Sequence, residues 1–366
     1  MKKRLKRLLL IIVSIVLIFI LFMRFYKPFG APTCKKDWEN YSKRSVIFKD
    51  GKFSYSEDYT IMCNWNDPYK DRKTGKGITP KDTIPFEQYK YTEPENDETL
   101  ITWLGHSSIL IQMHGLNILI DPVFEKKASP FSFITPDRIA DAPLDVDDLP
   151  EIDLLLLTHD HYDHESYETL TKLDNKVKKY IVPLGMEKDL KKFGINIEKV
   201  TNMAWWEELN ANGLTIACTP SKHYSLRYLL DKNDTLWCSY VLKDENVTIF
   251  DSSDTGYGEH FKEIYEKYGE IDFGLFDGAQ YNERWHSIHM FPEESVQAAI
   301  DIHSKVSMLQ HHCAFILSDH SWDEPIDRFV RRAKEEKIEY VTPILGQTFN
   351  LNDYKAYQNE WWKEIQ

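Results

Sequence analysis

At the centre of this 366-residue chain stand seven residues, Thr158-His159-Asp160-His161-Tyr162-Asp163-His164. The residues directly before them, Asp153-Leu154-Leu155-Leu156-Leu157, predict a short buried strand. That strand would deliver imidazoles and a carboxylate to its carboxyl end, where open α/β sheets place their chemistry. Imidazole nitrogen with carboxylate oxygen suits Zn²⁺ or another borderline divalent ion, and not Ca²⁺ or Mg²⁺. The stretch therefore predicts a metal site within an α/β fold.

A histidine or an aspartate also follows each of three downstream segments that have the pattern of strands. These segments and the residues after them are 214–220 with His223, 246–250 with Asp254, and 306–310 with His311 and His312. Each is a weak signal alone, because a histidine after a strand is more often a surface residue than a ligand. Their order, and their positions behind strands, reinforce one another and favour a shared metal centre.

The spacing H-x-H-x-D-H over residues 159–164, with the His, Asp and His further on, resembles the signature of the metallo-β-lactamase superfamily. The resemblance implies an αββα sandwich that binds two metal ions. It would assign His159, His161 and His223 to one metal, Asp163, His164 and His311 to the other, and Asp254 to a bridge between them. His311 is preferred to His312 because the run His-His-Cys-Ala-Phe at 311–315 resembles a family stretch whose first residue is the ligand.

Several shorter motifs resemble one branch of that superfamily, the N-acylphosphatidylethanolamine-hydrolysing phospholipase D enzymes. They are Thr102-Trp103-Leu104-Gly105-His106-Ser107-Ser108, Leu116 to Phe124, Trp205-Trp206-Glu207, Leu236 to Tyr240, Asp254-Thr255-Gly256-Tyr257 and His289 to Glu294. The resemblance spans about residues 45 to 350. The chain departs from the branch at Cys238, where a glycine is expected, and this change should affect packing more than chemistry.

The ligand set and the resemblance together imply phosphodiester chemistry. Two Zn²⁺ ions ~3.5–4 Å apart, with manganese or iron as alternatives, can hold a bridging hydroxide that attacks phosphorus in line. Asp163 would be both a ligand and the acceptor of the nucleophile's proton. His106 and His289 are candidates for contact with the substrate phosphate or for protonation of the leaving group, with a plain structural role as the alternative. Asp121 would orient a ligating histidine or cap the strand before Pro122.

Two functions follow from this interpretation. The first is phospholipase D-type hydrolysis of N-acylphosphatidylethanolamine-like phospholipids or other phosphodiesters, and the second is hydrolysis of another bond, such as a sugar-phosphate lactone. A scaffold that has lost its metals is disfavoured by the complete set of seven ligands. A lipid substrate needs an apolar wall beside the metals. Candidates for that wall are Trp205, Trp206, Tyr224, Tyr228 and Trp285, with core packing the favoured alternative for the first two.

The composition agrees with a large globular enzyme. Length alone would suggest two domains, but the resemblance implies one hydrolase domain, residues 98–366, behind an N-terminal arm or linker, residues 25–97. A hydrophobic fraction of 42% and an aromatic fraction of 13% supply ample material for a core. Helical patterns at 259–268 and 292–304 lie between predicted strands and indicate a mixed α/β domain. The polar, Pro- and Tyr-rich residues of the arm either wrap the domain or form a mobile linker.

The N-terminal segment predicts a single-pass membrane anchor. Residues 1–7 carry five Lys and Arg residues and form a basic cytoplasmic tail, and residues 8–24 form the anchor. Its uncharged part, Leu8 to Met23, would span ~24 Å as a helix, slightly less than a typical hydrocarbon core. The basic tail places the catalytic domain on the extracytoplasmic side. The alternative is a signal peptide cleaved near Gly30-Ala31, which the adjacent Pro32 disfavours.

The net charge of −13 argues against a nucleic-acid substrate, because RNA-cutting relatives need a basic track for phosphates. The expected partners are a phospholipid or other phosphodiester substrate and the membrane, while a homodimer is left open. The cysteines, Cys34, Cys63, Cys218, Cys238 and Cys313, are odd in number and lack C-x-x-C spacing. No disulfide framework is therefore expected, and Cys218 and Cys238 are expected to be buried in strands.

Overall fold

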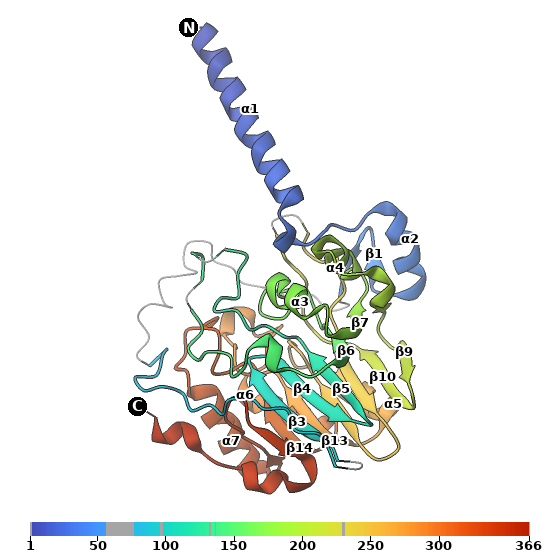
Figure 1. The fold of residues 1–366 in the computed structure, drawn as a ribbon, viewed down its shortest axis with the longest axis vertical. Helices are drawn as coiled ribbons and strands as arrows, with labels where there is room; N and C mark the ends of the chain where they lie inside the picture. Colours follow the sequence, from blue (N-terminus) through green and yellow to red (C-terminus); the bar gives the residue numbers. More distant parts are fainter. Residues whose placement is uncertain are drawn as a thin grey trace.

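Two seven-stranded mixed sheets, packed face to face, form the centre of the computed structural model (Figure 1). The structure describes residues 2–55, 77–95, 98–131, 133–135, 137–228 and 231–365. The first sheet has the order β16-β3-β4-β5-β6-β7-β8, and the second has the order β15-β14-β13-β12-β11-β10-β9. Strands β5 to β8 are parallel in the first sheet, as are β12 to β15 in the second, and the remaining pairs are antiparallel.

The first sheet consists of β3 (Leu100–Gly105), β4 (Ser108–Met113), β5 (Leu116–Ile120), β6 (Ile152–Leu156), β7 (Val177–Pro183), β8 (Val200–Met203) and β16 (Thr348–Asn350). The second consists of β9 (Glu208–Ala211), β10 (Leu214–Thr219), β11 (Ser239–Lys243), β12 (Thr248–Asp251), β13 (Ile271–Phe276), β14 (Ser304–Leu309) and β15 (Glu339–Tyr340). Strands β6, β10, β12 and β14 correspond to the four strands predicted before candidate ligands.

Helices cover the outer faces of both sheets. On the first sheet these are α3 (Tyr167–Leu173) and α4 (Glu187–Phe193), and on the second they are α5 (His260–Tyr268) and α6 (Pro292–Asp301), with α7 (Glu324–Glu336) beside α6. Short 3₁₀ helices are η3 (Val146–Asp148), η4 (Ile197–Lys199), η5 (Glu283–Trp285), η6 (Leu351–Tyr357) and η7 (Trp361–Glu364). The layers confirm the predicted αββα sandwich, and α5 and α6 confirm the two predicted helices.

The leucine run of β6 places the metal motif. Leu154 and Leu156 lie in the core between the sheets, whereas Leu155 and Leu157 pack with the residues of α3 and α4. A strand covered on both faces can be apolar at every position, and each buried leucine contributes ~1.5–3 kcal/mol. Because a slip of one residue would exchange the two faces, this packing fixes the register of the strand. The residues after Leu157 therefore emerge at a defined edge of the sandwich.

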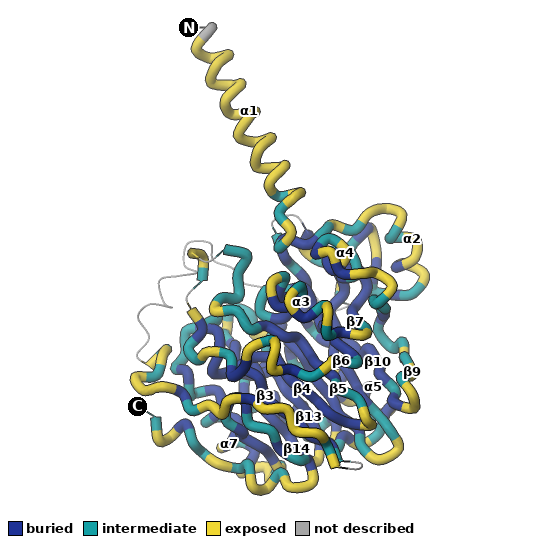
Figure 2. The backbone as a smooth tube through the Cα atoms, in the orientation of Figure 1, coloured by how far each residue is buried: buried dark blue, intermediate teal, exposed yellow. Residues whose placement is uncertain are grey.

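The N-terminal helix α1 (Lys2–Phe25) projects from the body, and its residues from Arg4 onward are exposed except for the partly buried Met23 (Figure 2). Its part Arg4–Phe25 has a mean hydropathy of 3.0 and no buried residues, so it is long and apolar enough to span a membrane. A short 3₁₀ helix, η1 (Lys27–Phe29), α2 (Lys35–Arg44) and the hairpin β1 (Phe48–Lys49) and β2 (Lys52–Phe53) follow. Tyr41, Phe48 and Phe53 of this region pack against Leu184 and Trp237 of the sandwich.

The four described cysteines are unpaired, and Cys63 lies outside the described residues. Cys218 lies in β10 and Cys238 directly precedes β11, and both are buried. Their place between the sheets is that of small apolar side chains.

Candidate metal centre

The turns that follow strands of both sheets meet at one edge of the sandwich and carry the candidate ligands. Strand β6 leads to residues 158–164, β10 to His223, β12 to Asp254 and β14 to His311. The backbone of His106, Asp121, Ser253 and His311 in these turns has positive φ, between 40° and 67°. Residues other than glycine seldom adopt this conformation, and it persists where the surrounding contacts hold it in place.

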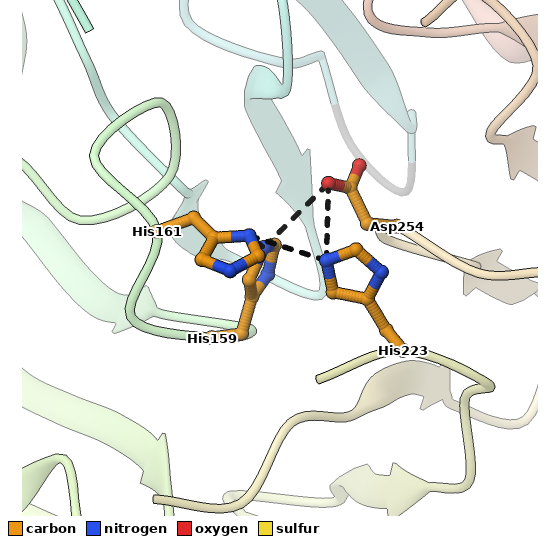
Figure 3. A group of neighbouring side chains, drawn as sticks. All are labelled: His159, His161, His223 and Asp254. Carbon is orange, nitrogen blue, oxygen red and sulfur yellow. Dashed lines mark hydrogen bonds and ion pairs between the residues drawn. The ribbon is translucent and has the colours of Figure 1, made fainter. Parts of the chain in front are cut away.

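His159, His161 and His223, the first half-site, form a compact group with Asp254 (Figure 3). His161 Nδ1 lies 3.0 Å from His159 Nε2 and 3.2 Å from His223 Nε2. One ligand atom from each of the four side chains lies within 4.8 Å of the others. Ligand atoms this close to one another could all bind a single cation placed between them.

Asp163, His164 and His311, the second half-site, lie beside the first. His164 Nε2 is 3.7 Å from Asp163 Oδ2, and His164 and His311 form a second potential metal-binding group with Asp254. Among the described residues, the buried Nε2 atoms of His164 and His311 have no hydrogen-bond partner. Two buried nitrogen atoms without partners are costly unless something else binds them, and a metal ion fits that need.

Asp254 lies between the two half-sites. Its Oδ2 is 3.6 Å from both His159 Nε2 and His223 Nε2, and its Oδ1 is 3.4 Å from His164 Nε2 and 3.1 Å from His311 Nδ1. One carboxylate oxygen thus faces each half-site. For His159, His223 and His164 this is the arrangement expected of a bridging ligand, whereas the His311 nitrogen nearest to Asp254 is Nδ1 and not Nε2.

The two half-sites differ in the groups behind their histidines. In the first, His159 Nδ1 contacts the Thr158 hydroxyl at 3.0 Å, and His223 Nδ1 contacts the Ile288 carbonyl at 3.1 Å. In the second, His164 Nδ1 lies 2.7 Å from Asp121 Oδ2, and His311 Nδ1 lies 3.1 Å from Asp277 Oδ1. Asp121 also accepts hydrogen bonds from the backbone and the hydroxyl of Thr158. Of its two predicted roles, orienting a histidine is therefore the one that its contacts favour.

The pKa values of the histidines also differ between the two half-sites. Burial lowers the pKa of His159, His161 and His223, and the neighbouring imidazoles act in the same direction. Burial alone would also lower the pKa of His164 and His311, but the carboxylates around them, Asp254 first, outweigh it and raise both pKa values. Burial would raise the pKa of Asp254, yet His164 and His311 hold it well below its usual range.

His289 and His106 lie on opposite sides of the cluster. His289 Nδ1 donates to Asp277 Oδ2 at 3.0 Å, and its partly exposed ring meets that of His223 edge-to-face, with 5.0 Å between the ring centroids. Burial would lower the pKa of His289, but Asp277 and Asp254 raise it to about 9. His106 is fully buried, with Nε2 2.9 Å from Asp163 Oδ2, and burial lowers its pKa to about 4 despite that contact.

The structure brings His311 and not His312 to the cluster. The His312 ring packs on Trp103 at 4.4 Å, and its Nδ1 contacts the Cys313 thiol. Sequence reasoning missed Asp277, which follows β13 and contacts both His289 and His311. The pattern that could have identified Asp277 is the one that identified Asp254, an apolar strand followed by an acidic residue.

The five aromatic candidates for an apolar wall lie in three different places. The Tyr224 ring lies 4.6 Å from that of His161. The Trp285 carbonyl accepts the His289 backbone N–H, so the Trp285 backbone lies beside the cluster, while its indole N–H donates to the Gln280 carbonyl. Trp205 donates its indole N–H to the Trp237 carbonyl, and Trp206 packs in the core cluster that also holds residues of α5 and α6. Tyr228 instead packs 6.3 Å from Phe29, next to the N-terminal segment.

The geometry agrees with comparisons to known proteins. A family model, the Beta-lactamase superfamily domain, matches residues 116–312. An uncharacterized protein of Mycobacterium tuberculosis is 30% identical over 288 residues, which is 78% of this chain and 77% of the relative. N-acyl-phosphatidylethanolamine-hydrolyzing phospholipase D 1 of Caenorhabditis elegans is 32% identical over 270 residues, which is 69% of this chain and 76% of the relative.

Solved structures agree on the fold. CmlA, a diiron beta-hydroxylase from Streptomyces venezuelae, matches with a TM-score of 0.52 at 18% identity, over 70% of this chain and 55% of that one. The chain thus belongs to the metallo-β-lactamase superfamily and is a metal-dependent hydrolase of that superfamily. N-acylphosphatidylethanolamine-hydrolysing phospholipase D enzymes are among its homologues. Since CmlA carries iron on this fold, the fold alone does not select zinc.

Proposed function

We propose that this chain is a membrane-anchored dinuclear zinc phosphodiesterase that hydrolyses N-acylphosphatidylethanolamine-like phospholipids in the manner of a phospholipase D. The main support for the proposal is that all seven predicted ligands lie close together at one edge of the sandwich. The 32% identity to an enzyme named for this reaction supports the substrate class.

Each half-site would hold one ion, and Asp254 would be shared between them. When bound, the ions would polarise the phosphodiester and supply a nucleophilic water near neutral pH. The mixed nitrogen and oxygen donors favour zinc, with manganese or iron as alternatives. Asp163 contributes a ligand oxygen and accepts the proton of the attacking water.

His289 is the group in this centre that is best placed to act as an acid. Its Nδ1 is held by Asp277, and in the protein without metal Asp277 and Asp254 raise its pKa to about 9. Its Nε2, 3.9 Å from Asp254 Oδ2, can donate to a phosphate oxygen or to the leaving alcohol. His106 is buried behind Asp163, so its proposed role is to hold that carboxylate in position without touching the substrate.

The substrate would approach from the side where His161, Asp163, Tyr224 and His289 are partly exposed. Tyr224 and Trp285 would supply apolar surface for the lipid chains next to the metals. Helix α1 would anchor the enzyme, with the catalytic domain on the extracytoplasmic side. An anchored enzyme should resist extraction from membranes by carbonate, whereas release of a chain that begins near Pro32 would mean a cleaved signal.

The test is a substrate panel with the full-length protein in mixed micelles. N-acylphosphatidylethanolamine, phosphatidylcholine, a soluble aryl phosphodiester and a sugar-phosphate lactone are compared at equal concentration, and bound metal is measured by mass spectrometry. We expect about two zinc ions per chain and the fastest turnover on the first lipid. A clear preference for the lactone would overturn the proposed reaction, and a chain without metal would overturn the proposed site.

A further inference from the structure

The six residues after α1, Tyr26 to Ala31, lie against the sandwich, and their long-range hydrogen-bond partners are 104 to 199 positions away in the sequence. We call these residues the strap. The Ala31 N–H donates to Asp189 Oδ1, and Lys192 Nζ donates to the Gly30 carbonyl. Both partners belong to α4. The strap is therefore held by α4 of the body and does not pass freely from α1 to the domain.

A third contact leads from the strap to the metal motif through one buried arginine. Arg227 Nε donates to the Pro28 carbonyl at 2.8 Å. Its Nη1 donates to the Asp160 carbonyl at 2.6 Å and the Glu165 carbonyl at 3.0 Å, and it forms an ion pair with Glu165 Oε2 at 2.7 Å. Its side chain is only 1% exposed. One guanidinium thus joins the strap to both ends of the metal loop, residues 160–165.

The metal loop is also tied back to the segment that carries Arg227. The Tyr162 hydroxyl donates to the Arg227 carbonyl at 2.8 Å, and the Tyr162 ring lies 4.3 Å beneath the guanidinium. The Leu226 N–H donates to Asp160 Oδ1 at 3.0 Å. His161, Asp163 and His164 stand between these fixed points. Their positions therefore depend on where Arg227 is held.

We propose that the strap, acting through Arg227, positions the metal loop, so that the segment joining the membrane helix to the domain is part of the metal-binding unit. This inference rests on the proposed function only in requiring that the loop binds a metal ion. Arg227 is a positioning residue, since the described hydrogen bonds of its guanidinium are with the loop and the strap. A planar guanidinium can bond Pro28, Asp160 and Glu165 together, while an ammonium group cannot reproduce that fork.

The seat of the strap can be disturbed without changing the metal loop. Gly30 has φ +66°, and a Cβ on it would collide with the Asp189 carboxylate. Gly269, after α5, has φ +83°, but a Cβ on it would meet nothing within 4 Å. Gly30→Ala and Gly269→Ala therefore impose a similar backbone strain, and only the first displaces the strap.

The experiment loads full-length wild type, Gly30→Ala, Gly269→Ala and Arg227→Lys with Co²⁺, and records the visible absorption spectrum. Zn²⁺ affinity is measured by competition with a chromogenic chelator, and thermal unfolding is followed for each protein. We expect Gly30→Ala and Arg227→Lys to lose about tenfold to a hundredfold in affinity for at least one ion and to show altered cobalt bands. Gly269→Ala should keep wild-type affinity and bands, even where it melts earlier.

The outcomes separate the two proposals. A wild type that takes up no metal would refute the proposed function. A wild type that binds metal, together with unchanged affinity and bands in Gly30→Ala, would refute the positioning role and leave the proposed function standing. Should Gly30→Ala fail to fold, the same readouts on Arg227→Lys decide the question, because that variant keeps the positive charge beside Glu165.

Discussion

The first and second half-sites use the same kind of nitrogen donor but have different support. A hydroxyl and a carbonyl stand behind His159 and His223, whereas the carboxylates Asp121 and Asp277 stand behind His164 and His311. A carboxylate makes the imidazole that it orients a more basic ligand. We therefore expect the second half-site to bind its ion more firmly, and the first, next to the open side, to hold the more exchangeable ion.

The largest effect should come from removing a ligand of the first half-site. His161→Ala should lose at least one ion per chain and reduce turnover on the order of a thousandfold or more, because a ligand that fixes the ion also fixes the nucleophile. Metal content and initial rates check this. His114→Ala, a histidine in the β4–β5 turn away from the cluster, is the matched control and should keep both. Full metal and activity in His161→Ala would contradict the assignment.

A pair of milder variants tests the difference in support directly. Asp121→Asn removes the carboxylate behind His164 and should weaken the tighter ion about tenfold to a hundredfold. Thr158→Val removes the hydroxyl behind His159, which also donates to Asp121, and should weaken the other ion about threefold to tenfold while affecting the tighter ion less than Asp121→Asn does. Stepwise titration with Zn²⁺ gives both constants. Equal losses from the two variants would show that the supporting groups do not distinguish the half-sites.

The pH dependence of metal binding should differ between the half-sites. The pKa of His164 and His311 is raised in the protein without metal, so each ring keeps its second proton to a higher pH, and an incoming ion must displace it. The pKa of the first half-site histidines is lowered, so these rings are already neutral. As the pH falls, affinity should therefore decline first at the second half-site. Calorimetric titrations in buffers of different ionisation enthalpy count the protons released by each ion.

The smallest effect concerns the substrate side of the first half-site. Trp285→Ala removes an aromatic ring one turn before His289, and should reduce turnover of a long-chain phospholipid severalfold while changing a soluble aryl phosphodiester little. Trp206→Ala, in the core cluster near α5, is the comparison, since any loss there should be equal for both substrates. Equal losses from Trp285→Ala would remove it from the lipid wall.

The sequence predicted the strands that lead to ligands because their signals are local. Leu154 and Leu156 face one side of the sheet, and Leu155 and Leu157 face the other. Four identical residues do not show which side each one faces, but a run of leucines between polar residues still indicates a strand buried on both sides. Asp277 escaped notice because an acidic residue after a strand is also a common cap, and only the folded chain supplies its two histidine partners.

The contacts of Arg227 could not be predicted for a different reason. Its partners Pro28, Asp160 and Glu165 come from segments separated by up to 199 positions, and no local pattern records such a pairing. The contacts between the arm, residues 25–97, and the domain could not be predicted for the same reason. The packing of Tyr41 and Phe53 on Trp237 depends on tertiary contacts that polar, weakly periodic flanking sequence does not reveal.

The last strand of the first sheet has a consequence for how the protein is made. β16 pairs with β3, and the bonded hydroxyls of Thr348 and Thr102 lie 246 positions apart. During synthesis, the outer edge of β3 has no partner until residues 348–350 have left the ribosome, and an unpaired strand edge can pair with strands of other molecules. Such long-range closure also slows folding. A chain truncated before residue 348 would thus lack β16, and the unpaired edge of β3 would favour aggregation.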